Sequence, residues 1–256
     1  MKHLITTAIA LSLAAIAPSA FAQDDGINPT SSIASVSEYV FRGVSLGGAS
    51  LQPSTEISTD FGITVGAWYS AGLGSDSSVQ ADEIDLYISY ALPIEGPISA
   101  EVGGTYYHYP QFGSLFETED GFAGSYEVYG SVGLNDVPLS PSATVYYDFT
   151  LENLTVEGFV GHSLDLPRDG WSADLGLTAG LVDSDQGFDY EWGTATVALN
   201  KAVTENIDFY LSGNFTVNSE DDTLGFDRVV APNGLEFATR DSDTQFWFGT
   251  GLSVSY

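Results

Sequence analysis

The chain ends in the stretch Thr244-Gln245-Phe246-Trp247-Phe248-Gly249-Thr250-Gly251-Leu252-Ser253-Val254-Ser255-Tyr256. Phe246, Phe248, Leu252, Val254 and Tyr256 occupy one parity, while the other parity carries mainly Gln, Gly and Ser. Successive side chains of a strand point to opposite faces. The stretch therefore predicts a strand with one apolar face and one polar face.

The same alternation recurs back to residue 31 and predicts about twelve strands of roughly ten residues. They are expected at 32–42, 51–60, 62–72, 82–91, 98–109, 124–134, 142–151, 154–164, 171–182, 190–200, 206–217 and 244–256. We predict an all-β fold, a closed antiparallel up-and-down transmembrane β-barrel. The very short connection at Glu152-Asn153 leaves ten or fourteen strands open.

The predicted connections alternate in length. Those after the even-numbered strands are mostly short turns, whereas the longest ones, 110–123 and 218–243, follow odd-numbered strands. Short inner turns and long outer loops are typical of outer-membrane barrels. A soluble β-sandwich also alternates, but its strands are usually shorter. Aromatic residues gather near the strand ends, where interfacial girdles are expected.

The first 22 residues have the composition of a signal peptide. Lys2 precedes an apolar run from Leu4 to Ala17, and Ala20-Phe21-Ala22 fits a small-x-small cleavage site. The run is too short for a spanning helix. We therefore predict a signal peptide at 1–22 and a single barrel domain at 23–256, in the outer membrane of a Gram-negative bacterium.

The charge balance is strongly acidic. There are 35 acidic and six basic residues, and loss of Lys2 leaves a formal charge of about −30. Nucleic acid is excluded as a partner, because binding it requires neutralising phosphates with Lys and Arg. Disorder is unlikely on composition, since 43% of the residues are apolar and 13% aromatic. No cysteine is present, so disulfides and thiolate chemistry are excluded.

Sorting the strands by parity assigns ten acids and one base to the polar face. These candidate lumen residues are Glu38, Arg42, Glu56, Glu83, Asp85, Glu101, Glu127, Asp148, Glu157, Asp174 and Asp208. One arginine cannot neutralise ten carboxylates in a dry core. The pattern favours a narrow wet passage that attracts cations, with a lumen plugged by loops as the alternative. The strand at 190–200 is ambiguous, because Trp192, Thr194 and Thr196 compete with Ala195, Val197 and Leu199 for the apolar face.

Arg42 is the single base on this face. It is either a constriction charge that orients an anionic solute group or a structural anchor for Glu38 and other acids. The anchor is the simpler interpretation.

Specific words in the sequence resemble a known family. Ser37-Glu38-Tyr39-Val40-Phe41-Arg42-Gly43-Val44-Ser45 resembles the S-x-Y-x-F-R-G-x-S signature of the TorF-like porin family, the Gcw_chp family of conserved hypothetical proteins. The motif positions are Ser37, Tyr39, Phe41, Arg42, Gly43 and Ser45. Glu83-Ile84-Asp85-Leu86-Tyr87 with Tyr90, and Tyr106-Tyr107-His108-Tyr109-Pro110, are similar to later stretches of the family. Leu46 replaces the Gln that often follows the signature. The resemblance implies an outer-membrane channel without assigned catalytic or ligand residues.

Enzymatic chemistry is not expected. Some outer-membrane barrels are hydrolases that use Ser and His, but His108 and His162 both fall on the apolar parity, away from any nucleophile. No cofactor is expected, although calcium could bind the acidic outer segment of Asp183, Asp185 and Asp189. Such ions would bridge the outer loops to lipopolysaccharide.

The C-terminal strand predicts a further partner. Phe246, Phe248 and the terminal Tyr256 resemble the signal read by the outer-membrane assembly machinery. Together these observations predict a porin-like channel for passive diffusion of small hydrophilic solutes, with cations preferred. The alternatives are a plugged structural or adhesin-type barrel acting through loop 218–243 and, less favoured, an outer-membrane hydrolase.

Overall fold

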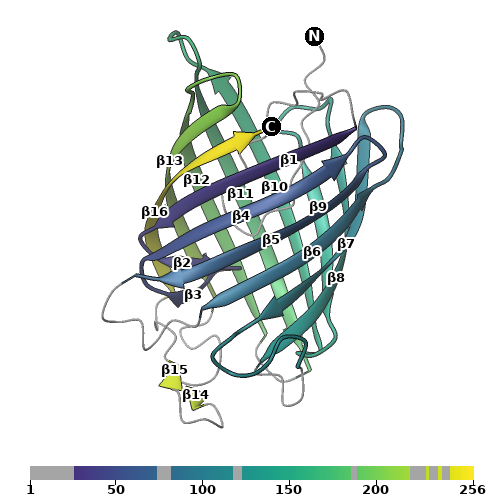
Figure 1. Ribbon diagram of the computed structural model, residues 1–256, viewed down its shortest axis with the longest axis vertical. Helices are drawn as coiled ribbons and strands as arrows, with labels where there is room; N and C mark the ends of the chain where they lie inside the picture. The colour runs from purple at the N-terminus through teal and green to yellow at the C-terminus, as the bar shows by residue number, and fades with distance from the viewer. Residues whose placement is uncertain are drawn as a thin grey trace.

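The structure is a computed structural model that describes residues 26–73, 82–117, 123–185, 189–219, 229–230, 236–237 and 243–256. The predicted signal peptide at 1–22 lies outside the described residues, as does most of loop 218–243. Figure 1 shows strands wound around a common axis, and the start of β1 lies beside the end of β16 at one end of the barrel. We call this the terminal end, and the opposite end, which carries β14 and β15, the loop end.

Twelve antiparallel strands form the closed wall, which confirms the predicted architecture and strand count. In chain order they are β1(Ile27–Val36), β4(Ser50–Thr59), β5(Ile63–Gly72), β6(Glu83–Ala91), β7(Ile98–His108), β8(Gly124–Leu134), β9(Ser142–Asp148), β10(Asn153–Asp165), β11(Trp171–Ser184), β12(Tyr190–Ala202), β13(Ile207–Asn218) and β16(Thr244–Ser255).

The first and last wall strands close the barrel. β1 pairs with β16 from Thr30–Ser255 to Val36–Gly249, and its other edge pairs with β4 along its whole length. Neighbours in the sheet are otherwise neighbours in sequence. Closure leaves no unpaired strand edge, which is what a lipid environment requires.

The predicted bounds of the first strand, 32–42, are wrong at both ends. β1 ends at Val36, and the following residues leave the wall to form a separate hairpin of β2(Tyr39–Phe41) and β3(Val44–Gly47). The expected strand at 142–151 also ends early, at Asp148, because residues 149–152 make the short turn into β10. The two-residue strands β14(Val229–Val230) and β15(Glu236–Phe237) pair with each other outside the wall.

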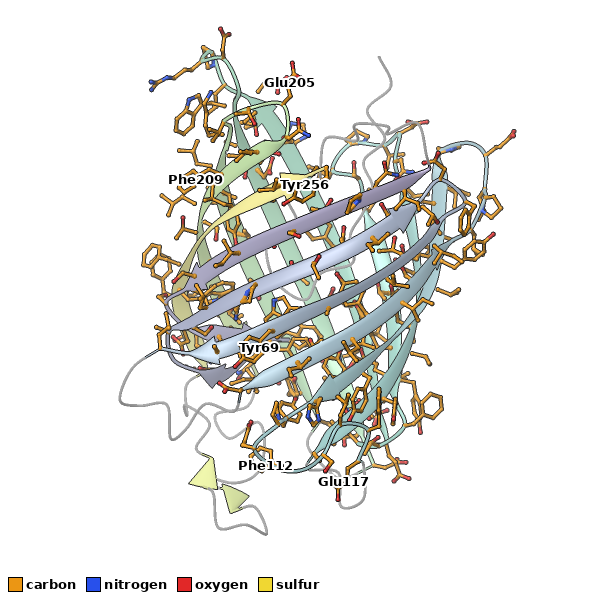
Figure 2. The ribbon with its side chains drawn as sticks, in the orientation of Figure 1. Tyr69, Phe112, Glu117, Glu205, Phe209 and Tyr256 are labelled. Atoms are coloured by element: carbon orange, nitrogen blue, oxygen red, sulfur yellow. The ribbon has the colours of Figure 1, made fainter. Side chains whose placement is uncertain are left out.

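The outer surface of the wall is apolar. Leu177, Val197 and Phe246 are 58%, 58% and 61% exposed, and Figure 2 shows Phe209 directed away from the barrel axis. Such a surface is stable against acyl chains rather than water, and closed barrels of this kind span bacterial outer membranes. The chain is therefore an outer-membrane β-barrel. Across the described residues, no helix is long and apolar enough to cross a membrane.

The sequence predicted aromatic girdles at the membrane interfaces, but the aromatic residues are not confined to those positions. Trp68, Trp192 and Trp247 are each 5% exposed or less, and they belong to the inner face together with Tyr107 and Tyr146. The interior thus combines carboxylates with aromatic rings. Much of this packing surrounds the β2–β3 hairpin.

Candidate functional site: the barrel lumen and its hairpin

The lumen hairpin, residues 37–49, is built on a two-residue turn. Arg42 and Gly43 both have positive φ, at 47° and 83°, and Phe41 pairs with Val44 on either side. Positive φ at both central residues is the type I′ geometry that matches the twist of paired strands. A Cβ on Gly43 would lie 2.3 Å from Cβ of Trp192, so glycine is also required by packing.

Hydrogen bonds fix the base of the hairpin. The Ser45 hydroxyl donates to Glu38 Oε1 at 2.6 Å, and the Ser37 backbone N–H donates to the Phe248 carbonyl at 2.8 Å. The Tyr39 N–H donates to the carbonyl of Gly48 at 3.2 Å. Glu38 and Ser45 are 8% and 2% exposed. The family motif is therefore a folded element inside the barrel rather than part of its wall.

One side of the hairpin contacts β5 to β9. The Tyr39 ring lies 5.5 Å from that of Trp68 on β5, and its hydroxyl donates to Glu83 on β6 at 2.8 Å. The Phe41 ring meets that of Tyr107 on β7 at 6.1 Å. These contacts hold the hairpin against the acidic wall.

The other side of the hairpin contacts β11, β12, β13 and β16. Val44 packs in one buried cluster with Val182, Tyr190 and Trp192, and Val40 packs in another with Val36 and Trp247. The Asn218 side chain donates to the Gly43 carbonyl at 2.9 Å. Contacts on both sides mean that the hairpin crosses the lumen at the loop end.

Arg42 at the hairpin tip makes a bidentate ion pair with Glu127 on β8. Nη1 and Nη2 donate to the two carboxylate oxygens at 2.7 and 2.8 Å, and the guanidinium lies 4.2 Å from the ring centroid of Tyr146. Burial alone would lower the pKa of Arg42, but the Glu127 carboxylate raises it well above its ordinary value. Arg42 thus remains charged and anchors the hairpin tip to Glu127, whereas Glu38, the acid named in the prediction, accepts the Ser45 hydroxyl.

The predicted lumen acids at the loop end are buried around the hairpin. Asp85 is 0% exposed, and Glu83, Glu127 and Asp148 are each 3% exposed. Glu83 accepts hydroxyls from both Tyr39 and Tyr109, at 2.8 and 3.2 Å. Asp148 Oδ1 accepts two backbone N–H groups of the turn into β10, at 2.8 Å each. This half of the lumen is packed and nearly dry.

The remaining predicted lumen acids are partly exposed. Glu56, Glu101, Asp174 and Asp208 lie toward the terminal end, and Glu157 lies nearer the hairpin. Two of them accept tyrosine hydroxyls across the sheet: Glu56 from Tyr87 at 3.1 Å, and Glu101 from Tyr129 at 2.7 Å. Asp174 accepts the side-chain amide of Asn200 at 2.6 Å. We call this half of the lumen the inner chamber.

Glycines let these tyrosines lie flat on the wall. A Cβ on Gly66 would lie 2.2 Å from Tyr87 Cζ, and a Cβ on Gly103 would lie 2.5 Å from Tyr129 Cζ. Each ring therefore rests on a glycine of the adjacent strand, which places its hydroxyl against a carboxylate. The inner chamber is lined by fixed rings and acids that water reaches.

The opposite wall, β11 to β13, carries mainly neutral polar groups, with Asp174 and Asp208 as its acids. Thr194 hydrogen-bonds Thr216 at 3.0 Å, and Thr196 donates to Asn214 at 2.8 Å. These contacts settle the ambiguous strand β12: Trp192, Thr194 and Thr196 face inward, while Val197 is 58% exposed on the outside. The lumen thus has a wall rich in carboxylates and tyrosines, facing a wall in which hydroxyls and amides predominate.

The predicted calcium segment does not form a cluster. Asp183, Asp185 and Asp189 are exposed, and Asp189 Oδ1 accepts the Ser184 backbone N–H at 2.8 Å. Residues 186–188, between these acids, lie outside the described residues. Within the described part of the chain, no three His, Asp or Glu side chains are grouped closely enough to hold a metal ion.

The two histidines of the described residues occupy different environments. His108 is 4% exposed, with Nδ1 2.9 Å from the Ala123 carbonyl oxygen and its ring stacked on Tyr106. It is therefore buried beside the β7–β8 connection rather than at an open interface. His162 is exposed.

The predicted assembly residues face outward. Phe246, Phe248 and Tyr256 are 61%, 50% and 55% exposed, and the two phenylalanine rings meet edge to face at 4.7 Å. Their surface position is compatible with recognition by other molecules.

The lumen hairpin was missed at the sequence level. The local signal that could have found it is Arg42-Gly43 between Phe41 and Val44, since a glycine in a two-residue connection marks a hairpin turn. The tyrosine–carboxylate pairs were also missed. They join different strands, so neither sequence spacing nor parity reveals them.

Comparisons with known proteins agree with this architecture. Residues 21–209 match the family described as "Bacterial protein of unknown function (Gcw_chp)". Curated protein sequences give no match. The NanC porin structure aligns with a TM-score of 0.54 at 10% identity, over 88% of this chain and 98% of that chain. The KdgM porin gives 0.55 at 11%, over 89% and 99%, and its complex with disordered oligogalacturonate gives 0.55 at 10%, over 90% and 99%.

At these identities the two porins show a shared fold and nothing finer. The match to the sequence family covers most of the chain and includes the motif that forms the lumen hairpin. The chain belongs to the Gcw_chp family of bacterial proteins.

Proposed function

We propose that this barrel is a porin-like channel for passive diffusion of small hydrophilic solutes, with cations preferred. The observation that carries the proposal is the inner chamber, where Glu56, Glu101, Asp174 and Asp208 are partly exposed on the inner face of a closed barrel. Partly exposed carboxylates are accessible to water. Transport would be diffusion biased by fixed charge, without covalent chemistry.

The sign of that charge favours cations. The sequence assigns ten acidic side chains to the lumen face, whereas the one base assigned to it among the described residues, Arg42, is already paired with Glu127. Arg168 and Lys201, the other basic residues in the described ranges, lie at the terminal end beside Trp171. Fixed negative charge in a narrow passage concentrates cations and repels anions. KdgM has been captured with oligogalacturonate, an anionic sugar chain. For this chain we expect such polyanions to be rejected.

The lumen hairpin would form the constriction. It touches strands on both sides of the barrel at the loop end and leaves the inner chamber partly exposed. The same contacts favour the second candidate function, a plugged barrel that acts through its outer loops. The two functions differ in one property, which is whether ions pass when the hairpin is in place.

Planar-bilayer recording of the purified barrel under a potassium chloride gradient tests the proposal. We expect open-channel current with a reversal potential of the sign that cation selectivity produces. A reversal potential of the opposite sign would reject the cation preference. Absence of current in the full chain, with current after removal of the hairpin, would favour the plugged barrel.

The remaining partners follow from the same proposal. The apolar belt would contact outer-membrane lipid, and the loop end would face lipopolysaccharide. The terminal strand with Phe246, Phe248 and Tyr256 would be read by the assembly machinery.

For the hydrolase alternative, His108→Ala and His162→Ala would abolish lipid hydrolysis, whereas a channel would keep its conductance in both variants.

A further inference from the structure

Two buried acids at the loop end have no ion pair with a basic side chain among the described residues. Glu83 and Asp85 both belong to β6, two residues apart on its inner face, and their carboxylates are close enough to interact electrostatically. They are 3% and 0% exposed. Arg42 of the lumen hairpin has both its Nη atoms committed to Glu127.

The two carboxylates differ in their partners. Glu83 accepts the hydroxyls of Tyr39 and Tyr109, one on each oxygen, which stabilises its ionised form. Apart from the Glu83 carboxyl itself, neither oxygen of Asp85 has a hydrogen-bond partner among the described residues. Two buried carboxyl groups that face each other require either a shared proton or a cation.

Two neutral oxygens beside this pair are also without partners. Ser70 Oγ and Gln52 Oε1 are buried, in residues 0% and 2% exposed, and neither has a hydrogen-bond partner in the described ranges. Ser70 lies directly opposite Glu83, and the pairs Leu51–Ala71 and Ser54–Trp68 place Gln52 next to Ser70. A shared proton between the carboxylates would leave these two oxygens unsatisfied.

We propose that Glu83, Asp85, Ser70 and Gln52 bind a calcium ion between β4, β5 and β6, behind the lumen hairpin. Two carboxylates match the charge of a divalent cation, and the neutral oxygens extend the donor set. Calcium accepts irregular sets of oxygen ligands, whereas magnesium demands near-octahedral geometry and retains its waters. The site contains two acids, so it is compatible with the finding that no three His, Asp or Glu side chains of the described residues are grouped closely enough to hold a metal ion.

The site would also secure the hairpin. Tyr39 belongs to β2 and donates to Glu83, so a cation that fixes the Glu83 carboxylate also fixes the position of Tyr39. The ring of Trp68, which lies opposite Asp85, packs against Tyr39 from the other side. Calcium would therefore fix the lumen hairpin to the acidic wall at a second point, in addition to the Arg42–Glu127 pair.

The test is calcium binding by the folded full-length barrel. Because the site is enclosed, the protein is refolded with calcium chloride or with a chelator, and bound calcium is measured by equilibrium dialysis and by calcium-dependent thermal stability. We expect one saturable site per chain. Asp85→Asn should weaken it by at least about tenfold, since calcium affinity follows ligand charge. Ser70→Ala should weaken it less.

Two control variants separate this site from others. Asp208→Asn removes one lumen carboxylate at the terminal end, and Asp183→Asn with Asp185→Asn removes the outer acidic segment. Both should keep the site. Equal binding in wild type and Asp85→Asn, loss of binding in the outer-segment variant, or no binding at all would overturn the proposal. A difference in gel mobility between unheated and heated samples verifies that each variant is folded. The readout involves no conductance, so its result is independent of the channel proposal.

Discussion

Glu127 and Glu101 face the same lumen under opposite conditions. Glu127, at the loop end, is 3% exposed and bonded to the Arg42 guanidinium and to the Tyr107 hydroxyl, at 2.7 to 3.0 Å. Glu101, at the terminal end, is partly exposed and bonded to the Tyr129 hydroxyl. The first carboxylate has lost its water and holds a structural element. The second retains water and remains free to attract ions.

The comparison teaches that residue type alone does not define function in this lumen. Both halves of the lumen contain carboxylates, tyrosines and aromatic rings packed on glycines. The lumen hairpin buries those at the loop end, whereas those at the terminal end stay partly exposed. Carboxylates near the hairpin therefore contribute to stability, whereas those in the inner chamber contribute to the field felt by a solute. Four experiments test this division.

The largest effect is expected for Arg42→Met. Removing the guanidinium leaves Glu127 buried without its counter-charge, which destabilises the folded state by about 3–5 kcal/mol. Urea unfolding of the barrel in lipid measures it. The double variant Arg42→Met with Glu127→Met should recover a large part of the loss, because it removes the stranded charge. A single variant as stable as wild type would mean that the pair does not anchor the hairpin.

Gly43→Ala should follow, with Gly96→Ala as its control. Both glycines have positive φ, at 83° and 107°, so both variants carry backbone strain. A Cβ at Gly96 meets nothing within 4 Å, whereas one at Gly43 overlaps Trp192. We expect Gly43→Ala to lose about 1–3 kcal/mol more than Gly96→Ala, the usual range for overpacking. Equal losses would place the hairpin tip away from Trp192.

A smaller difference is expected between two tyrosines. Tyr107→Phe removes a hydrogen bond to buried Glu127, and Tyr129→Phe removes one to partly exposed Glu101. The first should cost about 1–3 kcal/mol, because no water replaces the hydroxyl, and the second less than about 1 kcal/mol. Chemical denaturation of both variants in the same lipid compares them. If the order is reversed, the two halves do not differ in hydration as described.

The smallest effect is expected for Glu101→Gln on ion selectivity. One of several chamber charges is removed, and salt screens the rest, so the cation-to-anion permeability ratio should fall by less than about twofold in 0.1 M salt. Reversal potentials at several salt concentrations measure it. The effect should grow as salt is lowered. A selectivity change that is independent of salt would point to a local binding site instead of a diffuse field.

The wall of the barrel could be predicted from the sequence because its determinants are local. Alternation along 244–256 placed Phe246 outside and Trp247 inside, and the same rule placed Asp85 and Glu127 on the inner face. The face on which a strand side chain lies depends only on whether its position in the strand is odd or even. Membrane burial enforces it along every strand.

The hairpin could not be predicted in the same way, because its determinants are distant. Glu38, Val40 and Arg42 continue the parity of the preceding strand, so 37–42 is equally compatible with the wall. The contact that favours the lumen joins Arg42 to Glu127, 85 residues away. Likewise β12 remained ambiguous because its orientation depends on packing of Trp192 against Val44 and Val182.

The central claim is that the lumen hairpin narrows a cation-preferring channel, and single-channel conductance after its removal tests it most directly. Deleting 38–47 leaves Ser37, Gly48 and Ala49 to join β1 and β4, whose ends Val36 and Ser50 are already paired. We predict a conductance several times that of wild type, with cation selectivity retained through the inner chamber. An unchanged conductance in the folded deletion variant would contradict the account.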